Sequence, residues 1–171
     1  AQMEAITAEQ AAQMTTAQAK ALLGAVIDSL SADAVDALSP AAVGAIPVEA
    51  IDNVNATAFA GFTAAQIAEM SPAQFAVLGN GVSGQLANFG AAQGAGITSA
   101  QIKSLDASDI AALSSDAVIA LKPATLAAIV TTAVDDIANE AFANFTADQI
   151  KALTPAQFAG IDNGQTPYIG A

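Results

Sequence analysis

The sequence contains no cysteine, no histidine, no tryptophan and no arginine among its 171 residues. Without thiolates and imidazoles, zinc, haem and iron–sulfur centres lack their usual ligands, and neither a Ser-His-Asp triad nor a Cys-His pair can be assembled. We therefore expect no metal site, no cofactor and no catalytic residue, and we predict that the protein is not an enzyme. The absence of cysteine also excludes a disulfide framework.

Cationic side chains are scarce as well. Four Lys stand against 16 Asp and Glu, which gives a formal net charge of -12. Affinity for nucleic acid depends on cationic neutralisation of phosphates, so this composition excludes nucleic acid as a partner. So few Lys residues leave a trypsin-like protease little to cleave, which suits a protein outside the cell. We expect each of them to be a single solvated charge: Lys20, Lys103, Lys122 and Lys151.

Long hydrophobic runs are missing, although 54% of the residues are hydrophobic and the mean hydropathy is +0.50. A helix that spans a bilayer needs about 20 mostly apolar residues. The richest apolar run, residues 21–27, is far shorter, so we expect no membrane span. The first residues show no charged leader followed by an apolar segment, and we expect any export signal to be absent or already removed.

A large apolar residue returns every eight positions along most of the chain, which is typical of a repeat protein. A second apolar residue usually follows five positions later. The first series consists of Ile6, Met14, Leu22, Leu30, Leu38, Ile46, Val54, Phe62, Met70 and Leu78. The second series consists of Ile97, Leu105, Leu113, Leu121, Ile129, Ile137, Phe145, Leu153 and Ile161. The chain is therefore predicted to be an array of eight-residue units.

The units carry the signals of a helix start. Ser or Thr commonly follows the first apolar position and Gln often lies three residues further on, as in Thr63–Gln66 and Thr154–Gln157. In such a capping box the hydroxyl accepts from a free amide of the first turn, and the Gln side chain reaches back to the N–H of the cap residue. Four prolines directly follow the cap position, where a missing N–H costs nothing: Pro40, Pro72, Pro123 and Pro155.

Caps that recur every eight residues leave each helix room for one to two turns. Helices this short are marginal on their own, so their stability must come from stacked neighbours. We therefore predict an all-α fold, a solenoid or superhelix of short capped helices. We expect units that lack a cap residue, at Leu23 and Val130, to merge into longer helices. A β-solenoid is the alternative, disfavoured because Ala and Gln are poor strand formers.

The eight-residue units belong to a larger duplication. An offset of 83 residues aligns 14–88 with 97–171 without a gap, with 34 identities in 75 positions. The register of the units breaks between the two series, where glycines cluster in the way that tight turns favour. We predict a first module at 1–88 with an extra N-terminal unit, a Gly-rich linker at 89–96, and a second module at 97–171.

Three pairs of carboxylates are the strongest candidates for a chemical site, because two close carboxyl groups can perform acid–base or glycosidic chemistry. They are Asp33 with Asp36, Asp106 with Asp109, and Asp135 with Asp136. All lie at polar positions of the units that we expect to face outward, so we interpret them as a solvated acidic face. A divalent cation could bridge them, but the sequence has neither an EF-hand loop nor a Gly-Gly-x-Gly-x-Asp repeat.

Two further features have structural rather than functional interpretations. The segment 79–84 is rich in glycine but lacks the Lys-Ser/Thr ending of a phosphate-binding loop, so we interpret it as a turn. Phenylalanines recur at equivalent positions of the two halves and are interpreted as core, with an aromatic ligand cleft as the alternative: Phe59, Phe62, Phe142 and Phe145.

The unit at 153–161, Leu-Thr-Pro-Ala-Gln-Phe-Ala-Gly-Ile, resembles the helical octapeptide-type repeats of large secreted bacterial surface proteins. These include adhesin-like, type I-secreted and S-layer-associated chains, in which such repeats stand beside other modules. The chain is also similar, less closely, to the superhelical repeats of mesothelin-like proteins. Both resemblances imply an extracellular structural or adhesive role, and neither supplies a catalytic residue to transfer.

We therefore expect a non-enzymatic extracellular module of a bacterial cell-surface layer, fibre or adhesin. Apolar side chains would stack along an axis, while Asp, Gln, Thr and Ser would form a hydrated outer surface. The expected partners are further copies or neighbouring modules of a larger protein, because stacked repeats expose apolar ends unless they are capped. The alternative is a module whose groove binds carbohydrate, such as a surface polysaccharide, or a partner peptide.

Overall fold

The computed structural model describes residues 6–54, 56–80 and 84–161. All regular structure in these ranges is helical, and no strand occurs in them. The prediction of an all-α fold is therefore confirmed, and the β alternative is wrong. No helix in the described ranges has both the length and the apolar character that crossing a bilayer requires.

Seventeen α-helices and two 3-10 helices lie in the described residues, and most of them have four to six residues. They are α1 Ala8–Ala12, α2 Thr16–Ala19, α3 Gly24–Asp28, α4 Ala32–Asp36, α5 Pro40–Ala45, α6 Val48–Ile51, α7 Ala56–Gly61, α8 Ala64–Glu69, α9 Pro72–Asn80, η2 Gln85–Asn88, α10 Ala91–Gly96, α11 Ser99–Ile102, α12 Ala107–Ala112, α13 Ser115–Ile119, α14 Pro123–Leu126, η3 Thr131–Ala133, α15 Asn139–Ala143, α16 Ala147–Ala152 and α17 Pro155–Gly160.

The helices begin where the capping signals predict. At α8, Thr63 Oγ1 accepts from the Gln66 N–H at 3.3 Å, and Gln66 Oε1 accepts from the Thr63 N–H at 2.8 Å. The same reciprocal box starts α1, α2, α11, α16 and α17. Units without a cap residue do not merge, because Leu23 and Val130 still precede separate helices, α3 and η3. That expectation is wrong.

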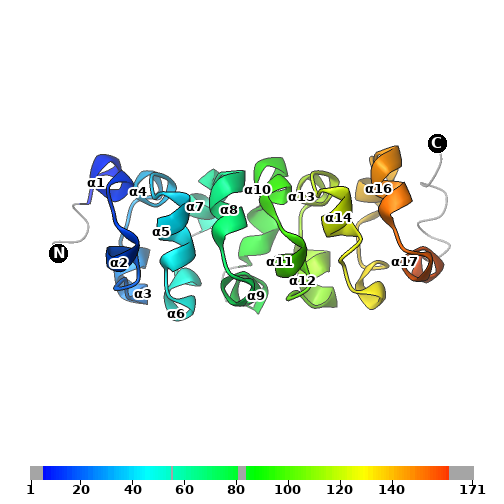
Figure 1. Ribbon diagram of the computed structural model, residues 1–171, viewed down its shortest axis with the longest axis horizontal. Helices are drawn as coiled ribbons and strands as arrows, with labels where there is room; N and C mark the ends of the chain where they lie inside the picture. The colour runs from blue at the N-terminus through cyan, green and yellow to red at the C-terminus, as the bar shows by residue number, and fades with distance from the viewer. Residues whose placement is uncertain (1–5, 55, 81–83, 162–171) are drawn as a thin grey trace.

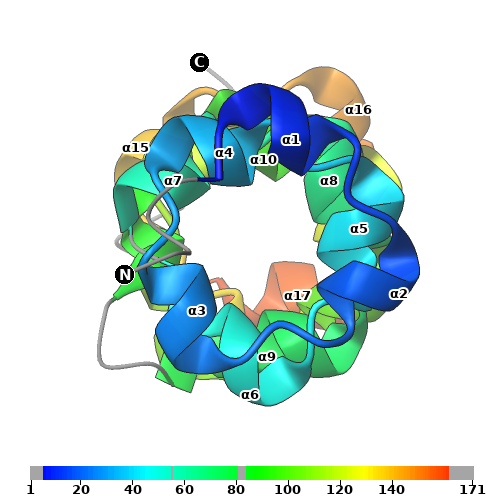
Figure 2. The same ribbon diagram turned by 90° about the vertical axis from the view of Figure 1, so that its left-hand side faces the viewer.

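The helices follow one path around a common axis, and we call one passage around it a circuit. With the 3-10 helices counted, each helix packs on the helix three places further along the chain, as α1 does on α4 and α2 does on α5. Viewed along the axis, α1, α4 and α10 lie on one side of the ring, opposite α6 and α9 (Figure 2). Viewed from the side, the helices advance along the long axis in chain order (Figure 1). Tertiary contacts therefore join each circuit mainly to its two neighbours.

The apolar series that recurs every eight residues fills the interior of this winding. All its members are buried except Ile6, Met14 and Phe145, which are half-buried and lie near the two ends of the described chain. Small side chains pack beside this series, since Ala34, Ala42, Ala50, Ala58, Ala117, Ala133 and Ala141 are fully buried. One continuous core therefore runs along the length of the molecule.

The segment predicted to be a linker, 89–96, is a regular part of the array. Residues 91–96 form α10, which packs on α13 as α1 packs on α4. Its glycines serve close contact: a Cβ on Gly94 would overlap the main chain of Ala117, and a Cβ on Gly96 would overlap that of Ala64. Gly94 and Gly96 therefore mark close approach of helices, while Gly90 is the residue before the first turn of α10.

The helix at 91–96 extends the duplication. The unit at 6–13, predicted to be an extra one, aligns with 89–96, so residues 6–88 match residues 89–171 at the same offset of 83. The break in register comes from three additional residues between Gln74 and Gln85, which lie 11 positions apart rather than eight. The predicted turn at 79–84 falls partly outside the described residues. Its first two residues belong to α9, and Gly84 has a φ of 55°, which favours glycine.

Candidate functional site

Seven glutamines in the described part of the chain are buried, although Gln is mostly found at protein surfaces. None of them is more than 3% exposed. They are Gln66, Gln74, Gln85, Gln93, Gln101, Gln149 and Gln157. The expectation that Gln lies on the hydrated outer surface is therefore wrong for these residues.

Gln66 shows what such a side chain does. Its Oε1 accepts from the Thr63 N–H at the start of α8, while its Nε2 donates to the carbonyl oxygens of Asp36 and Leu38, both at 2.9 Å. Those carbonyls lie at the C-terminal end of α4, where main-chain oxygens have no partner within their own helix. One amide thus satisfies the start of one helix and the end of another helix in the preceding circuit.

The other six glutamines make the same donation to the preceding circuit, and we call the seven together the glutamine ladder. Gln85 makes it without a cap, since its Oε1 is buried and has no hydrogen-bond partner in the described structure. In every case Nε2 donates to main-chain carbonyls 28 to 34 residues earlier. The acceptors are Val43 and Ile46 for Gln74, Asp52 and Val54 for Gln85, Ala60 and Phe62 for Gln93, Ile67 and Met70 for Gln101, Ile119 and Leu121 for Gln149, and Leu126, Ala127 and Ile129 for Gln157.

Hydroxyl side chains add further bonds between circuits. Thr125 occupies a ladder position in α14, and its Oγ1 donates to the Ile97 carbonyl at 3.1 Å. Ser104 donates to the Pro72 carbonyl at 3.0 Å, and Ser114 donates to the Phe89 carbonyl. Polar side chains therefore work together with the apolar core to hold successive circuits in register.

Asp109 occupies the ladder position of α12, and the prediction that it faces outward is wrong because it is buried. Its Oδ2 accepts from the Asp106 N–H at 3.0 Å. Burial raises the pKa of the Asp109 carboxyl, and the nearby charge of Asp106 acts in the same direction, although the Asp106 N–H partly opposes it. Hydrogen bonds from the Ser108 hydroxyl and then from the Asp109 N–H lower the pKa of Asp106.

The remaining acidic pairs lie elsewhere in the array. In α4, partial burial followed by the charge of Asp33 raises the pKa of Asp36, and Asp36 Oδ1 is buried without a hydrogen-bond partner in the described structure. Asp135 and Asp136 are both exposed after η3. The three pairs thus lie in three separate parts of the array, and among the described residues no three acidic side chains converge where they could hold a metal ion.

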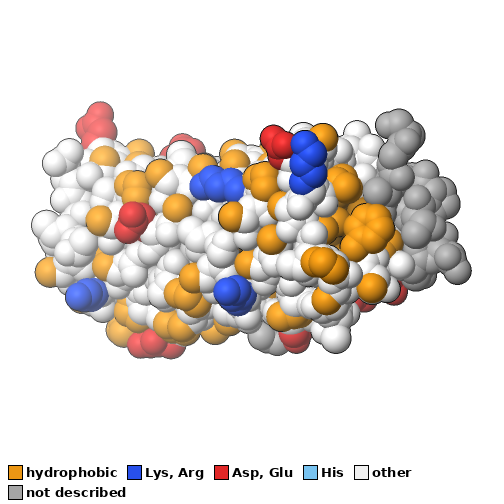
Figure 3. All heavy atoms as spheres, turned by 45° about the vertical axis from the view of Figure 1, so that its right-hand side comes forward, with side chains coloured by type: hydrophobic (Ala, Val, Ile, Leu, Met, Phe, Trp, Pro, Cys, Tyr) orange, Lys and Arg blue, Asp and Glu red, His pale blue; other side chains and the backbone are white. Residues whose placement is uncertain are grey.

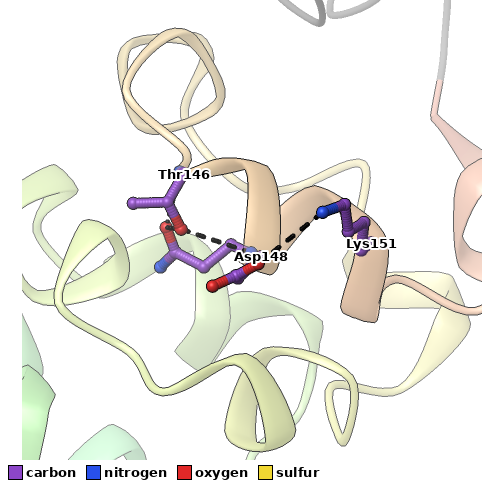
Figure 4. Close-up of polar contacts among 4 residues, drawn as sticks. Thr146, Asp148 and Lys151 are labelled. Carbon is purple, nitrogen blue, oxygen red and sulfur yellow. Dashed lines mark hydrogen bonds and ion pairs between the residues drawn. The ribbon is translucent and has the colours of Figure 1, made fainter.

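Phenylalanines and lysines lie mostly as predicted. Phe59, Phe62 and Phe142 are buried, whereas Phe145 is half-buried and contacts Phe142 with ring centroids 5.0 Å apart. Lysines 103 and 151 are exposed. In α16, Lys151 Nζ lies 3.9 Å from Asp148 Oδ1, one turn from the Thr146 cap (Figure 4). Such an exposed ion pair contributes at most about 1 kcal/mol, so this lysine has no strong structural role.

Sequence reasoning found five of the seven ladder glutamines as caps, all except Gln85 and Gln93, but missed their donation to the preceding circuit. The signal in the sequence is that the capping boxes use Gln rather than Glu as their third helical residue. A capping box accepts Glu as readily as Gln, yet none of these helices has Glu at that position, although acidic residues outnumber basic ones by 16 to four. Glu could accept from the cap N–H but, when ionised, could not donate to carbonyls of another circuit.

No protein-family model matches this sequence, and no curated protein is significantly similar to it. Function must therefore be inferred from the chain's own residues and geometry.

Proposed function

We propose that this chain is a non-enzymatic structural module of a bacterial surface layer, fibre or adhesin, and that its winding helices act as a solenoid. The observation that carries the proposal is the glutamine ladder, which joins neighbouring circuits at seven positions beside a continuous apolar core. The module would act mechanically: it would space, stiffen and assemble the surface layer or fibre.

The ladder supports a stiff element because its hydrogen bonds are directional. Each bond contributes about 1 kcal/mol net, and a buried amide or carbonyl left without a partner costs about 1–3 kcal/mol. Sliding or bending one circuit against the next would break these bonds before much apolar contact was lost. A rod held in this way resists bending and shear better than a stack held by apolar contacts alone.

An extracellular location is supported by the scarcity of Lys and Arg and by the resemblance to secreted surface repeats. Compact short helices add to this support, because the main chain of most units is engaged in caps and helical hydrogen bonds. Proteolysis requires an accessible, locally unfolded segment, and such segments would be few within a tightly stacked array.

The carbohydrate-binding alternative has less support. Flat aromatic side chains are the usual platforms for sugar rings, and they must be exposed to serve. Five of the seven phenylalanines are at most 1% exposed: Phe59, Phe62, Phe75, Phe89 and Phe142. Their burial favours a packing role over a ligand-binding one.

Immunogold electron microscopy of source cells tests the proposal, with antibodies raised against the purified chain. We expect gold on the outer surface or on surface filaments, with an axial repeat that matches one or two duplicated segments. Label confined to the cytoplasm would overturn the proposal. Small-angle X-ray scattering of the purified chain should give an elongated particle, and a compact spherical envelope would contradict the solenoid.

A further inference from the structure

The first circuit has an unfinished ladder. Gln10 and Gln18 form the same capping boxes as the buried glutamines, but they are exposed, and in the described part of the chain their Nε2 atoms donate to no acceptor. Their counterparts 83 residues later, Gln93 and Gln101, are buried and donate to carbonyls of the preceding circuit. The difference arises because no described circuit precedes α1 and α2.

Apolar residues beside these glutamines are also incompletely covered. Ile6 and Met14 are half-buried, whereas their counterparts Phe89 and Ile97 are at most 1% exposed. We call the surface formed by Ile6, Gln10, Met14 and Gln18 the N-terminal face. It combines amide donors that have no acceptor among the described residues with apolar side chains that are only half-buried.

The opposite end shows the complementary deficit. Phe158 is 48% exposed, and Phe145 and Ile150 are half-buried. We call these three residues the C-terminal face, and apolar side chains gather at this end of the molecule (Figure 3). Their counterparts in the first half are fully or almost fully buried: Phe62, Ile67 and Phe75.

The middle of the chain shows how two such faces fit together. There α10 packs on α8, and α11 packs on α9. Helices α10 and α11 are the counterparts of α1 and α2, while α8 and α9 are the counterparts of α16 and α17. The junction of the two halves is therefore an internal example of an N-terminal face seated on a C-terminal face.

We propose that a second copy of this chain seats its N-terminal face on the C-terminal face of the first, head to tail. This inference deepens the proposed function and rests on it, because it names the contact through which the module would assemble. By analogy with Gln93 and Gln101, the Nε2 atoms would donate to these carbonyls of the neighbouring copy: Ala143 and Phe145 for Gln10, Ile150 and Leu153 for Gln18. Since the two faces differ, the contact leaves one face of each kind open and generates a linear fibre.

One residue distinguishes this contact from the internal junction. Gln13 takes the place of Gly96, whose Cα lies against Ala64 so closely that a Cβ would overlap it. The array accommodates a side chain at the equivalent position of α11, where Ser104 donates to the Pro72 carbonyl. A small shift therefore admits Gln13, and a glycine at this position should tighten the contact.

Charge opposes association over long range and sets its salt dependence. Each copy carries a net charge of -12, so copies repel one another at low ionic strength. On the helices that would meet, α1 carries Glu9 and α16 carries both Asp148 and Lys151. The local contact is therefore close to neutral, and we expect salt to strengthen association by screening the overall repulsion.

Sedimentation velocity over a range of concentrations, in 20 mM and 500 mM NaCl, tests the proposal. Wild-type protein should form dimers and longer species, and more of them in high salt. The double variant Gln10→Ala/Gln18→Ala should associate at least about tenfold more weakly than wild type. Phe158→Ser should show a similar loss. Gln13→Gly should associate more tightly than wild type. A control away from both faces is Thr57→Ala, at an exposed residue in the middle of the chain, which should behave as wild type.

Mixing gives the decisive readout. The glutamine double variant retains a good C-terminal face, and Phe158→Ser retains a good N-terminal face. At a concentration where wild type associates, each alone should be mostly monomeric, and their mixture should form one-to-one dimers that do not grow further. Circular dichroism confirms that each variant is folded, and Gln13→Gly tests the same contact without removing any interaction.

Three outcomes would overturn the inference: a wild-type chain that stays monomeric at high concentration and high salt, a mixture of the two variants that stays monomeric while wild type associates, or wild-type assembly that stops at a closed dimer. These outcomes are separate from failure of the proposed function. A monomeric but elongated helical chain found on the cell surface would remove only the head-to-tail contact, whereas cytoplasmic label would remove the structural role itself.

Discussion

At the scale of single residues, the choice between Gln and Glu carries more structural meaning than the choice between polar and apolar. Both residues complete a capping box, but only the amide can also donate to the carbonyls that end a helix in the preceding circuit. Gln66 does both within one side chain. In a chain this acidic, the preference for a neutral amide at this position indicates burial against acceptors.

Substitution Gln66→Glu separates the two roles. The carboxylate keeps an acceptor for the Thr63 N–H but loses both donations and lies against two carbonyl oxygens. We expect a loss of about 2–4 kcal/mol in the free energy of unfolding, measured by urea titration at pH 7 in dilute solution. Gln18→Glu, at an exposed capping box, is the matched control and should change stability by less than about 0.5 kcal/mol. Equal losses in the two variants would show that the ladder adds nothing to the cap.

Asp109 makes stability depend on pH at one ladder position. Its pKa in the folded chain is raised, so its ionisation opposes folding at neutral pH. That penalty is complete above the folded-state pKa and disappears as the pH falls through it toward the ordinary value of 3.8. Asp106 acts with the opposite sign, because its lowered pKa gives a stabilisation that is lost as the pH falls below the ordinary value.

Asp109→Asn should therefore stabilise the protein at pH 7 by about 1 kcal/mol, because a neutral amide replaces a buried charge. The difference from wild type should shrink as the pH approaches 4, as followed by urea unfolding at both pH values. Asp116→Asn, at an exposed position of α13, serves as the control. A benefit that grows on acidification would contradict the sign of this argument.

At the scale of the element, each helix is short because its successor's cap comes too soon for it to continue. Stability then depends on how closely each helix approaches the helix three places further on. Glycine permits the closest approaches, as at Gly94, whose Cα lies against the main chain of Ala117. Glycine is a poor helix former in isolation, so its presence inside α10 reflects packing between helices rather than local preference.

Gly94→Ala and Gly160→Ala form a matched pair that tests this point. At Gly94 the added methyl group would overlap main-chain atoms that cannot move aside, and we expect a loss of about 1–3 kcal/mol. At Gly160 the nearest atom, the Thr131 carbonyl oxygen, would lie 3.5 Å from the new Cβ, so the helical preference of Ala should give a gain of up to about 1 kcal/mol. Thermal unfolding followed by circular dichroism measures both, and a gain at both sites would refute the close-contact argument.

At the scale of the whole molecule, the array is nearly one-dimensional, since each circuit contacts mainly its neighbours. Inner circuits are held on two sides, and the first and last described circuits on one. In repeat proteins of this kind stability is roughly a sum of unit and interface terms, and local opening begins where interfaces are missing.

Hydrogen exchange measured by mass spectrometry should therefore show a gradient of protection. Amides of α7 to α11, in the middle, should exchange most slowly, and those of α1, α2 and α17 fastest. The measurement is made on dilute protein, where copies do not cover one another's faces. Protection that is uniform along the chain would indicate a single cooperative block instead.

The sequence alone determined the helix starts and the apolar interior, because caps and regularly spaced apolar residues depend on neighbours a few positions away. It also revealed the duplication, because identities at a fixed offset are visible in the sequence itself. The role of α10 was misread for the same reason: its glycines favour turns locally, and only the neighbouring circuits show that they permit close packing.

Tertiary structure alone decided what lies beside each unit 28 to 34 residues away. That spacing depends on the pitch of the winding, which no single eight-residue unit encodes. It places carbonyls under the Gln side chains, buries Asp109, and leaves Gln10, Gln18 and Phe158 uncovered at the two ends. The sequence thus determines the units, while the contacts that join them into one array arise from how the circuits stack.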